Sequence, residues 1–138
     1  MSIKKFYKEN GFVVVKDLVP SKQIDDLLKV FTEDIIKNKK IRLPLMDKQE
    51  FTKPLIINNK LQNPIGNPHC LKFLNKNLEK FNKECLKVIL TKKIYLSLKE
   101  IYDKKKFKLL MSMFFDQNAG TPAHQDCYYL DSLPIGNL

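Results

Sequence analysis

The stretch TPAHQDCYYL, residues 121–130, holds a histidine and an aspartate two positions apart, His124 and Asp126. In an extended backbone the side chains at i and i+2 lie on one face, so these two would project together while Gln125 points away. Two imidazoles and one carboxylate on one side of non-haem Fe(II) leave positions open for substrate and O₂. The pattern supplies two of those three ligands. It also fits a solvated His–Asp pair, because so short a pattern often arises by chance.

The residues before this motif predict a buried strand that leads into it. FKLLMSMFFDQ, residues 107–117, is about as long as a strand, and both of its alternating sets are mostly apolar. A strand of this kind is expected to be covered on both faces. The following NAGT ends the strand.

The first third of the chain predicts helix, strand and helix in that order. Residues 2–11 indicate a short helix with Gly11 at a left-handed C-terminal cap, and the β-branched run FVVVKDL at 12–18 indicates a strand. Residues 19–37 are typical of an amphipathic helix, with Ser21 as its N-cap. The positions on its apolar face are Ile24, Leu27, Leu28, Phe31 and Ile35.

The middle of the chain is expected to be irregular and then helical. Four prolines fall between 38 and 68, which predicts loops with a short strand at 54–57. Residues 69–103 predict two or three helices. Their apolar faces are marked by Leu71, Leu74 and Leu78 and by Ile94, Leu98 and Ile101. Without repeats or a low-complexity linker, residues 1–138 are interpreted as one α+β domain.

The composition argues against several functional classes. The net charge is +10, but Arg42 is the single arginine among 25 basic residues, and the lysines are not gathered into one block. Arginine makes most bidentate phosphate and guanine contacts, so a lysine-rich surface explains the charge better than nucleic-acid binding; an anionic partner or substrate is the alternative. Three cysteines form no disulfide framework. No signal-peptide or membrane-length apolar run occurs, which predicts a cytoplasmic protein without a membrane contact.

Both ends of the chain resemble one enzyme family. SMFFDQNAGTPAHQDCYYLDSLPIGNL, residues 112–138, resembles the phytanoyl-CoA dioxygenase family of Fe(II)/2-oxoglutarate oxygenases, in which a strand, a Gly/Pro turn, H-Q-D, aromatic residues and P-x-G-x-L follow in that order. FYKENGFVVVKDLVPSKQIDDLLKVF, residues 6–31, is similar to the opening of the same family. The middle agrees only in being helical.

The resemblance implies a fold, a reaction and a site. The fold would be the N-terminal part of a double-stranded β-helix, or jelly roll, with helices packed outside. His124 and Asp126 would bind Fe(II), while Gln125 and Met113 would lie near 2-oxoglutarate; core packing is the alternative for Met113. The enzyme would hydroxylate a small-molecule substrate with O₂. Tyr128 and Tyr129 would shape the substrate pocket or form a half-buried pair.

The family pattern is incomplete in this sequence. Members need a second histidine ligand and an arginine for 2-oxoglutarate, both tens of residues beyond H-x-D. The residues after Asp126 include no histidine, arginine or lysine. His69 and Arg42 precede the motif, and His69 is interpreted as a surface or capping residue. Cys127 is interpreted as incidental. We therefore expect a truncated oxygenase that is inactive alone. The alternative is a short non-catalytic binding protein that associates through an exposed apolar strand.

Overall fold

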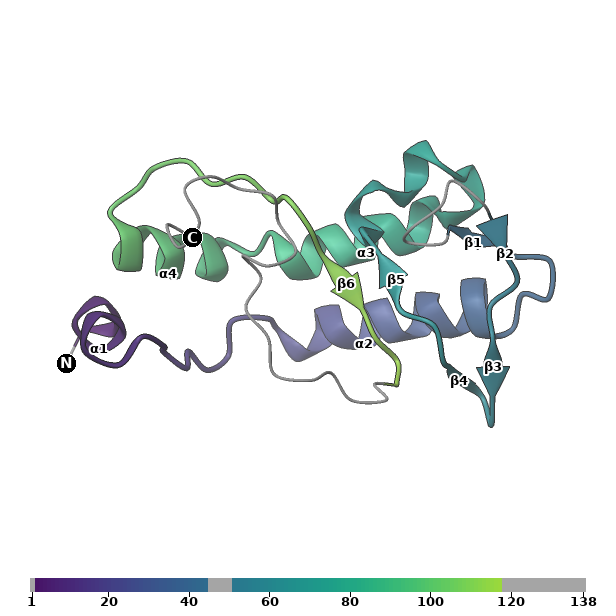
Figure 1. Ribbon diagram of the computed structural model, residues 1–138, viewed down its shortest axis with the longest axis horizontal. Coiled ribbons are helices and arrows are strands. Elements are labelled where there is room, and N and C mark those ends of the chain that lie inside the picture. The colour runs from purple at the N-terminus through teal and green to yellow at the C-terminus, as the bar shows by residue number, and fades with distance from the viewer. Residues whose placement is uncertain (1, 45–50, 118–138) are drawn as a thin grey trace.

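The computed structural model describes residues 2–44 and 51–117, which form an α+β arrangement of helices and short antiparallel strand pairs. Helices α2 (Ser21–Phe31) and α3 (Glu79–Ile89) lie side by side and run in opposite directions (Figure 1). α4 (Lys92–Tyr102) continues beyond α3, and α1 (Ile3–Asn10) packs near it. No helix in the described ranges is long and apolar enough to cross a membrane.

Helix α1 confirms the prediction from its sequence. The Ser2 side chain accepts a hydrogen bond from the Lys5 backbone N–H at 3.2 Å, which caps the N-terminus. At the other end Gly11 has φ of 76° and donates its N–H to the Tyr7 carbonyl at 2.8 Å. This left-handed conformation favours glycine, so the helix ends where the sequence indicates.

The predicted strand at 12–18 is wrong for the structure described. Phe12–Val15 pair with no other described strand, and Asp17 has a positive φ of 56° that turns the chain. Phe12 and Val14 instead line an apolar pocket with α1, where the Phe6 and Phe12 rings meet edge to face at 5.7 Å. A β-branched run favours an extended backbone, but only a neighbouring strand makes it part of a sheet.

Helix α2 carries the buried face that its spacing predicts, in part. Leu27, Phe31 and Ile35 are buried, while Ile24 and Leu28 are 42% and 47% exposed. The N-cap position is Pro20, so Ser21 is the first helical residue rather than the cap. The helix continues into a π-helical turn, η1 (Thr32–Ile36). Ile35, four positions after Phe31, lies on the same buried side.

The segment from 38 to 67 contains more strands than the sequence predicts, all of them two residues long. β1 (Leu43–Pro44) pairs with β2 (Phe51–Thr52), and β3 (Ile56–Ile57) pairs with β4 (Lys60–Leu61). β3 lies inside the range predicted as strand. Asn58 and Asn59, both with positive φ, form the turn between β3 and β4.

The helical patterning after residue 68 is confirmed. Two 3₁₀ turns, η2 (Pro68–Phe73) and η3 (Lys76–Leu78), precede α3 and α4. Leu71 and Leu78 are fully buried, whereas Leu74 is 57% exposed. α4 has no fully buried residue.

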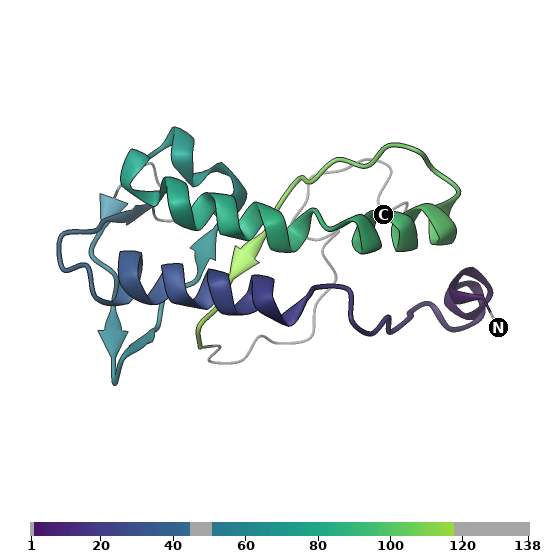
Figure 2. The ribbon, with the colours of Figure 1, turned by 180° about the vertical axis from the view of Figure 1, so that it is seen from behind.

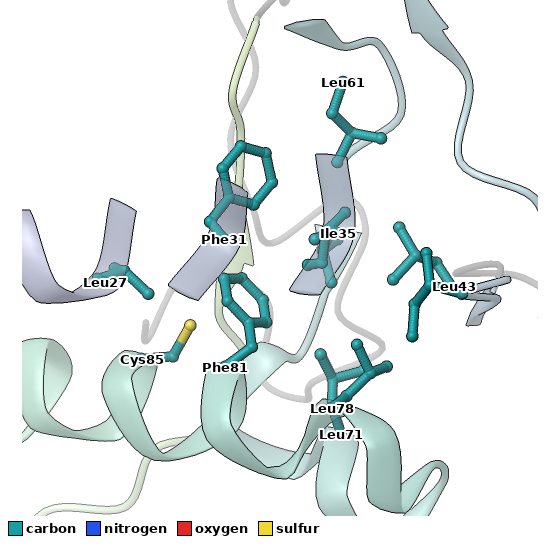
Figure 3. Packing of buried hydrophobic residues seen from close by; sticks show 11 residues of the cluster. Leu27, Phe31, Ile35, Leu43, Leu61, Leu71, Leu78, Phe81 and Cys85 are labelled. Carbon is teal, nitrogen blue, oxygen red and sulfur yellow. The ribbon is translucent and has the colours of Figure 1, made fainter. Parts of the chain in front are cut away.

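The core lies where α2, α3 and the small strands meet (Figure 3). Phe31 on α2 and Phe81 on α3 both belong to it, with ring centroids 6.1 Å apart and the ring planes tilted by 42°. The buried apolar residues come from both helices, the π-helical turn η1, the loop before β1, both 3₁₀ turns and three strands: Leu27, Phe31, Ile35, Ile41, Leu43, Leu61, Ile65, Leu71, Leu78, Phe81 and Cys85. The core therefore joins segments that are far apart in the sequence, from Leu27 to Cys85.

Candidate functional site

Strand β6 (Met113–Phe114) leads toward the H-Q-D motif and is anchored in the core. It pairs antiparallel with β5 (Ile65–Gly66), so that Ile65 lies opposite Phe114 and Gly66 opposite Met113. The Phe114 ring is 4.7 Å from that of Phe31 and 5.2 Å from that of Phe81. Three aromatic rings from three elements therefore fix the inner face of β6 on the helix pair.

The opposite face of the same strand is not covered by the described residues. Ser112, Phe114 and Asp116 are partly buried, while Met111, Met113 and Phe115 are 48%, 39% and 43% exposed. This alternation is the period of a strand with one packed face. The expectation that residues 107–117 are covered on both faces is therefore wrong within the described ranges, and strand pairing is confined to 113–114.

Met113 lies on this exposed face, opposite Gly66. Core packing, the alternative interpretation of Met113, does not hold among the described residues, because its side chain belongs to the face away from the three rings. A role beside 2-oxoglutarate stays a prediction.

Three polar side chains hold the start of β6 in register. Asn67, with φ of 47°, donates its N–H to the Ser112 carbonyl at 2.7 Å and accepts from the Ser112 N–H through Oδ1 at 3.2 Å. His69 Nδ1 lies 2.6 Å from Ser112 Oγ. His69 is thus partly buried and joins η2 to β6, which corrects its interpretation as a surface or capping histidine.

The end of β6 is held by an acidic side chain. Asp116 Oδ2 accepts a hydrogen bond from the Leu61 backbone N–H at 2.8 Å, and Oδ1 lies 3.4 Å from Lys60 Nζ. The carboxylate therefore joins β4 to the last described residues before the motif. Gln117 adds a contact, since its Oε1 accepts from Gln62 Nε2 at 3.3 Å.

A buried asparagine on α3 holds the turn η2, which contacts Ser112 just before β6. Asn82 on α3 is fully buried and donates from Nδ2 to the Pro68 carbonyl at 2.7 Å, at the start of η2. Its Oδ1 has no hydrogen-bond partner among the described residues. Asn82 thereby links α3 to the turn that carries His69.

The predicted ligands themselves, His124 and Asp126, lie outside the described residues, as do Gln125, Cys127, Tyr128 and Tyr129. Within the described ranges, no group of three His, Cys, Asp or Glu side chains is arranged to hold a metal ion. The fit of Fe(II) thus rests on the donor chemistry of an imidazole and a carboxylate, with no third ligand from the described part.

The other residues with chemical potential have structural roles. Arg42 donates from Nη1 to the carbonyls of Lys40 and Ile41 at 3.3 and 3.0 Å, close to its own position in the chain. Burial in the core raises the pKa of the Cys85 thiol to about 12, which makes it unreactive at neutral pH. Neither side chain forms a hydrogen bond with the residues that hold β6 in place.

Sequence reasoning missed Asn67, Ser112, Asp116 and Asn82 as the residues that position β6. Two of them left a local signal. Asn67 lies in NPIGNP, a turn-rich stretch that favours positive φ, and Asp116 is a charge directly after an apolar run. The pairing of Asn67 with Ser112 spans 45 positions, and no local pattern indicates it.

Comparisons with known proteins do not identify a family for this chain. No protein-family model, no curated protein and no solved structure matches the chain. The resemblance to the dioxygenase family therefore rests on the residues of the two end segments alone.

Proposed function

We propose that this chain is the N-terminal part of an Fe(II)/2-oxoglutarate-dependent oxygenase that hydroxylates a small molecule. The observation that carries the proposal is the H-Q-D spacing in a segment that follows a strand anchored at both ends. His124 and Asp126 lie eight and ten positions after Asp116, the last anchor of β6. A fixed strand shortly before the ligands limits where they can lie, and metal sites need such support.

The arrangement around β6 supports a jelly roll as the complete fold. In a jelly roll, antiparallel sheets face one another and pack apolar side chains between them. Helices α2 and α3 cover one face of β6, and its other face presents Met111, Met113 and Phe115. A second sheet packed on that face would bury these three side chains.

The chain's own residues would divide the work of the site. His124 and Asp126 would hold the metal, with Gln125 and Met113 beside the 2-oxoglutarate. When bound, Fe(II) with 2-oxoglutarate and O₂ supplies the oxidising chemistry that hydroxylates a C–H bond. A third ligand and an arginine for the co-substrate would come from sequence beyond these 138 residues, because Arg42 and His69 have the structural contacts described above.

The experiment compares three proteins for succinate release from 2-oxoglutarate under O₂ with added Fe(II). They are the 138-residue chain, the chain extended by the coding sequence that follows Leu138, and the extended chain with Asp126→Ala. We expect turnover only in the extended protein without the substitution. Robust turnover by the short chain would contradict the need for further ligands. A stop codon followed by unrelated sequence, or an extended chain that binds no iron, would overturn the proposal.

A further inference from the structure

The segment from Lys104 to Met111 offers a backbone edge that the described residues leave open. It runs from the end of α4 back to β6 (Figures 1 and 2). The Lys105 carbonyl accepts a hydrogen bond from Tyr95 Oη at 3.2 Å, and the Ser112 carbonyl accepts one from the Asn67 N–H. Between these two points, the backbone groups of 106–111 have no hydrogen-bond partner among the described residues. Such an edge is a template for pairing with another strand.

The side chains along this edge are apolar and exposed to solvent. Leu110 is 81% exposed, and Phe107 and Leu109 are each 37% exposed. The run continues directly into β6, which already pairs in the antiparallel direction. A partner strand that pairs with this segment would lie along the same direction as β6. It would also shield apolar side chains of the segment from water.

Both ends of the segment are held in place before any partner arrives. The Phe107 ring lies 6.1 Å from the Tyr95 ring and 6.5 Å from the Tyr102 ring. Ser112, at the other end, is fixed by two hydrogen bonds to Asn67: its carbonyl accepts from the Asn67 backbone N–H, and its N–H donates to Asn67 Oδ1. A segment fixed at both ends loses less conformational entropy on binding than a free one.

The charge around the edge indicates what kind of partner fits. Four lysines lie within five positions, at 104, 105, 106 and 108, and none forms an ion pair within the described ranges. With a net charge of +10, a second copy of the chain would bring the same lysines against them. Electrostatic complementarity therefore favours an acidic partner over self-association.

We propose that residues 104–111 bind an extended polypeptide segment of another protein by strand addition, with the partner's apolar side chains against Leu110 and its acidic side chains against the four lysines. Main-chain hydrogen bonds would supply the affinity and the charges the selectivity. This surface is distinct from the H-Q-D motif, so the inference does not depend on the proposed oxygenase activity.

The test uses the full 138-residue chain and a short labelled peptide that alternates valine and threonine between glutamate-rich ends. We expect fluorescence anisotropy to show binding that weakens with salt, and hydrogen exchange to show new protection of the 106–111 amides. The same peptide with lysine in place of glutamate should bind at least about tenfold more weakly, since several exposed charge pairs change from attraction to repulsion.

Two matched triple variants separate a local site from the overall charge. Lys104→Glu, Lys105→Glu and Lys106→Glu together should abolish binding, whereas the same change at Lys37, Lys39 and Lys40, which are also exposed, should leave most of it. Leu110→Pro, which removes an N–H from the edge, should also abolish binding while circular dichroism stays unchanged. Equal effects of the two triple variants, protection elsewhere than 106–111, or self-association through this segment would overturn the proposal.

Discussion

Within the described ranges, eleven apolar residues are buried around α2 and α3 at one end of the molecule, whereas α1 and α4 at the other end have none. The α1–α4 contact consists of partly exposed groups: the Tyr7 and Tyr102 rings 5.6 Å apart, and an ion pair between Lys4 and Asp103. Buried apolar area is the main favourable term in folding, so the free energy of unfolding should reside mostly in the α2–α3 end. β6 belongs to that end through Phe114, which ties the approach to the H-Q-D motif to the stable part of the chain.

The largest expected difference is in thiol reactivity. Burial raises the pKa of Cys85 to about 12 from 9.0, so its thiolate population in the native state should be about a thousandfold lower than that of an ordinary thiol. Cys70 is partly exposed. Alkylation at pH 8 followed by peptide mass mapping should therefore modify Cys70 and leave Cys85 until the chain unfolds. Equal rates at the two cysteines would show that the α2–α3 end opens readily.

A truncation in the core should cost far more than the same truncation at the other end. Phe81→Ala removes a fully buried ring that packs against Phe31 and Phe114, and we expect it to lower the free energy of unfolding by about 3–5 kcal/mol. Phe12→Ala, the matched control, removes a ring that is 58% exposed and should cost about 1 kcal/mol or less. Urea denaturation measures both. Similar losses would contradict the division of the molecule into two ends.

Loss of the buried hydrogen bond between Asn82 and the Pro68 carbonyl should have an intermediate effect on the free energy of unfolding. Asn82→Ala leaves the Pro68 carbonyl without its donor, and we expect a loss of about 1–3 kcal/mol in the free energy of unfolding. Asn77→Ala serves as a control, since Asn77 lies on η3 and contributes only its backbone N–H to a hydrogen bond. If Asn82→Ala is neutral, the turn that carries His69 is held by other contacts.

The tyrosine pair between α1 and α4 should contribute less. The two hydroxyl oxygens are 3.1 Å apart, and this hydrogen bond raises the pKa of Tyr102. Tyr7→Phe removes the bond, so the free energy of unfolding should fall by less than about 1 kcal/mol. Ultraviolet titration should show the pKa of Tyr102 returning toward its ordinary value. An unchanged titration would mean that the two hydroxyls do not meet in solution.

The smallest effect is expected at the exposed ion pair. The hydrogen bond and charge of Lys4 lower the pKa of Asp103 from 3.8, so the stabilisation is present above that pH and is lost as pH falls through the lower folded pKa. The melting temperature of the wild type should therefore slightly exceed that of Asp103→Asn at pH 6, and the difference should vanish at strongly acidic pH. A difference that grows as pH falls would contradict the sign.

Local features of the fold were predictable from sequence, and pairings between distant segments were not. Gly11 and the spacing of Leu27, Phe31 and Ile35 depend on neighbours within a turn or two, so α1 and most of α2 were predicted. Among the described residues, the strand predicted at 12–18 is not formed and the one predicted at 107–117 is reduced to Met113–Phe114, because strand pairing depends on partners far along the chain. β6 pairs with β5, which lies 48 positions earlier in the chain, and each of the two strands is two residues long.

The candidate site divides in the same way. The two donors of H-x-D follow from spacing alone, as does the expectation that they share a face. The contacts that hold the strand before the H-Q-D motif join segments more than 40 positions apart. They connect Ser112 with Asn67 and His69, and Asp116 with Leu61. For that reason His69 was taken as a surface residue, although it is a contact of β6.

The central claim is that His124 and Asp126 are the metal-binding pair of this chain, and the presence of only one other histidine makes a direct test available. Mn(II), a redox-stable substitute for Fe(II), would be titrated into the wild type, His124→Ala, Asp126→Ala and His69→Ala, with free metal followed by electron paramagnetic resonance. We expect the wild type to bind Mn(II) weakly, because two ligands make a poor site, and both motif variants to lose this binding. His69→Ala should retain it. Binding that survives both motif variants, or that is lost only with His69→Ala, would contradict the account.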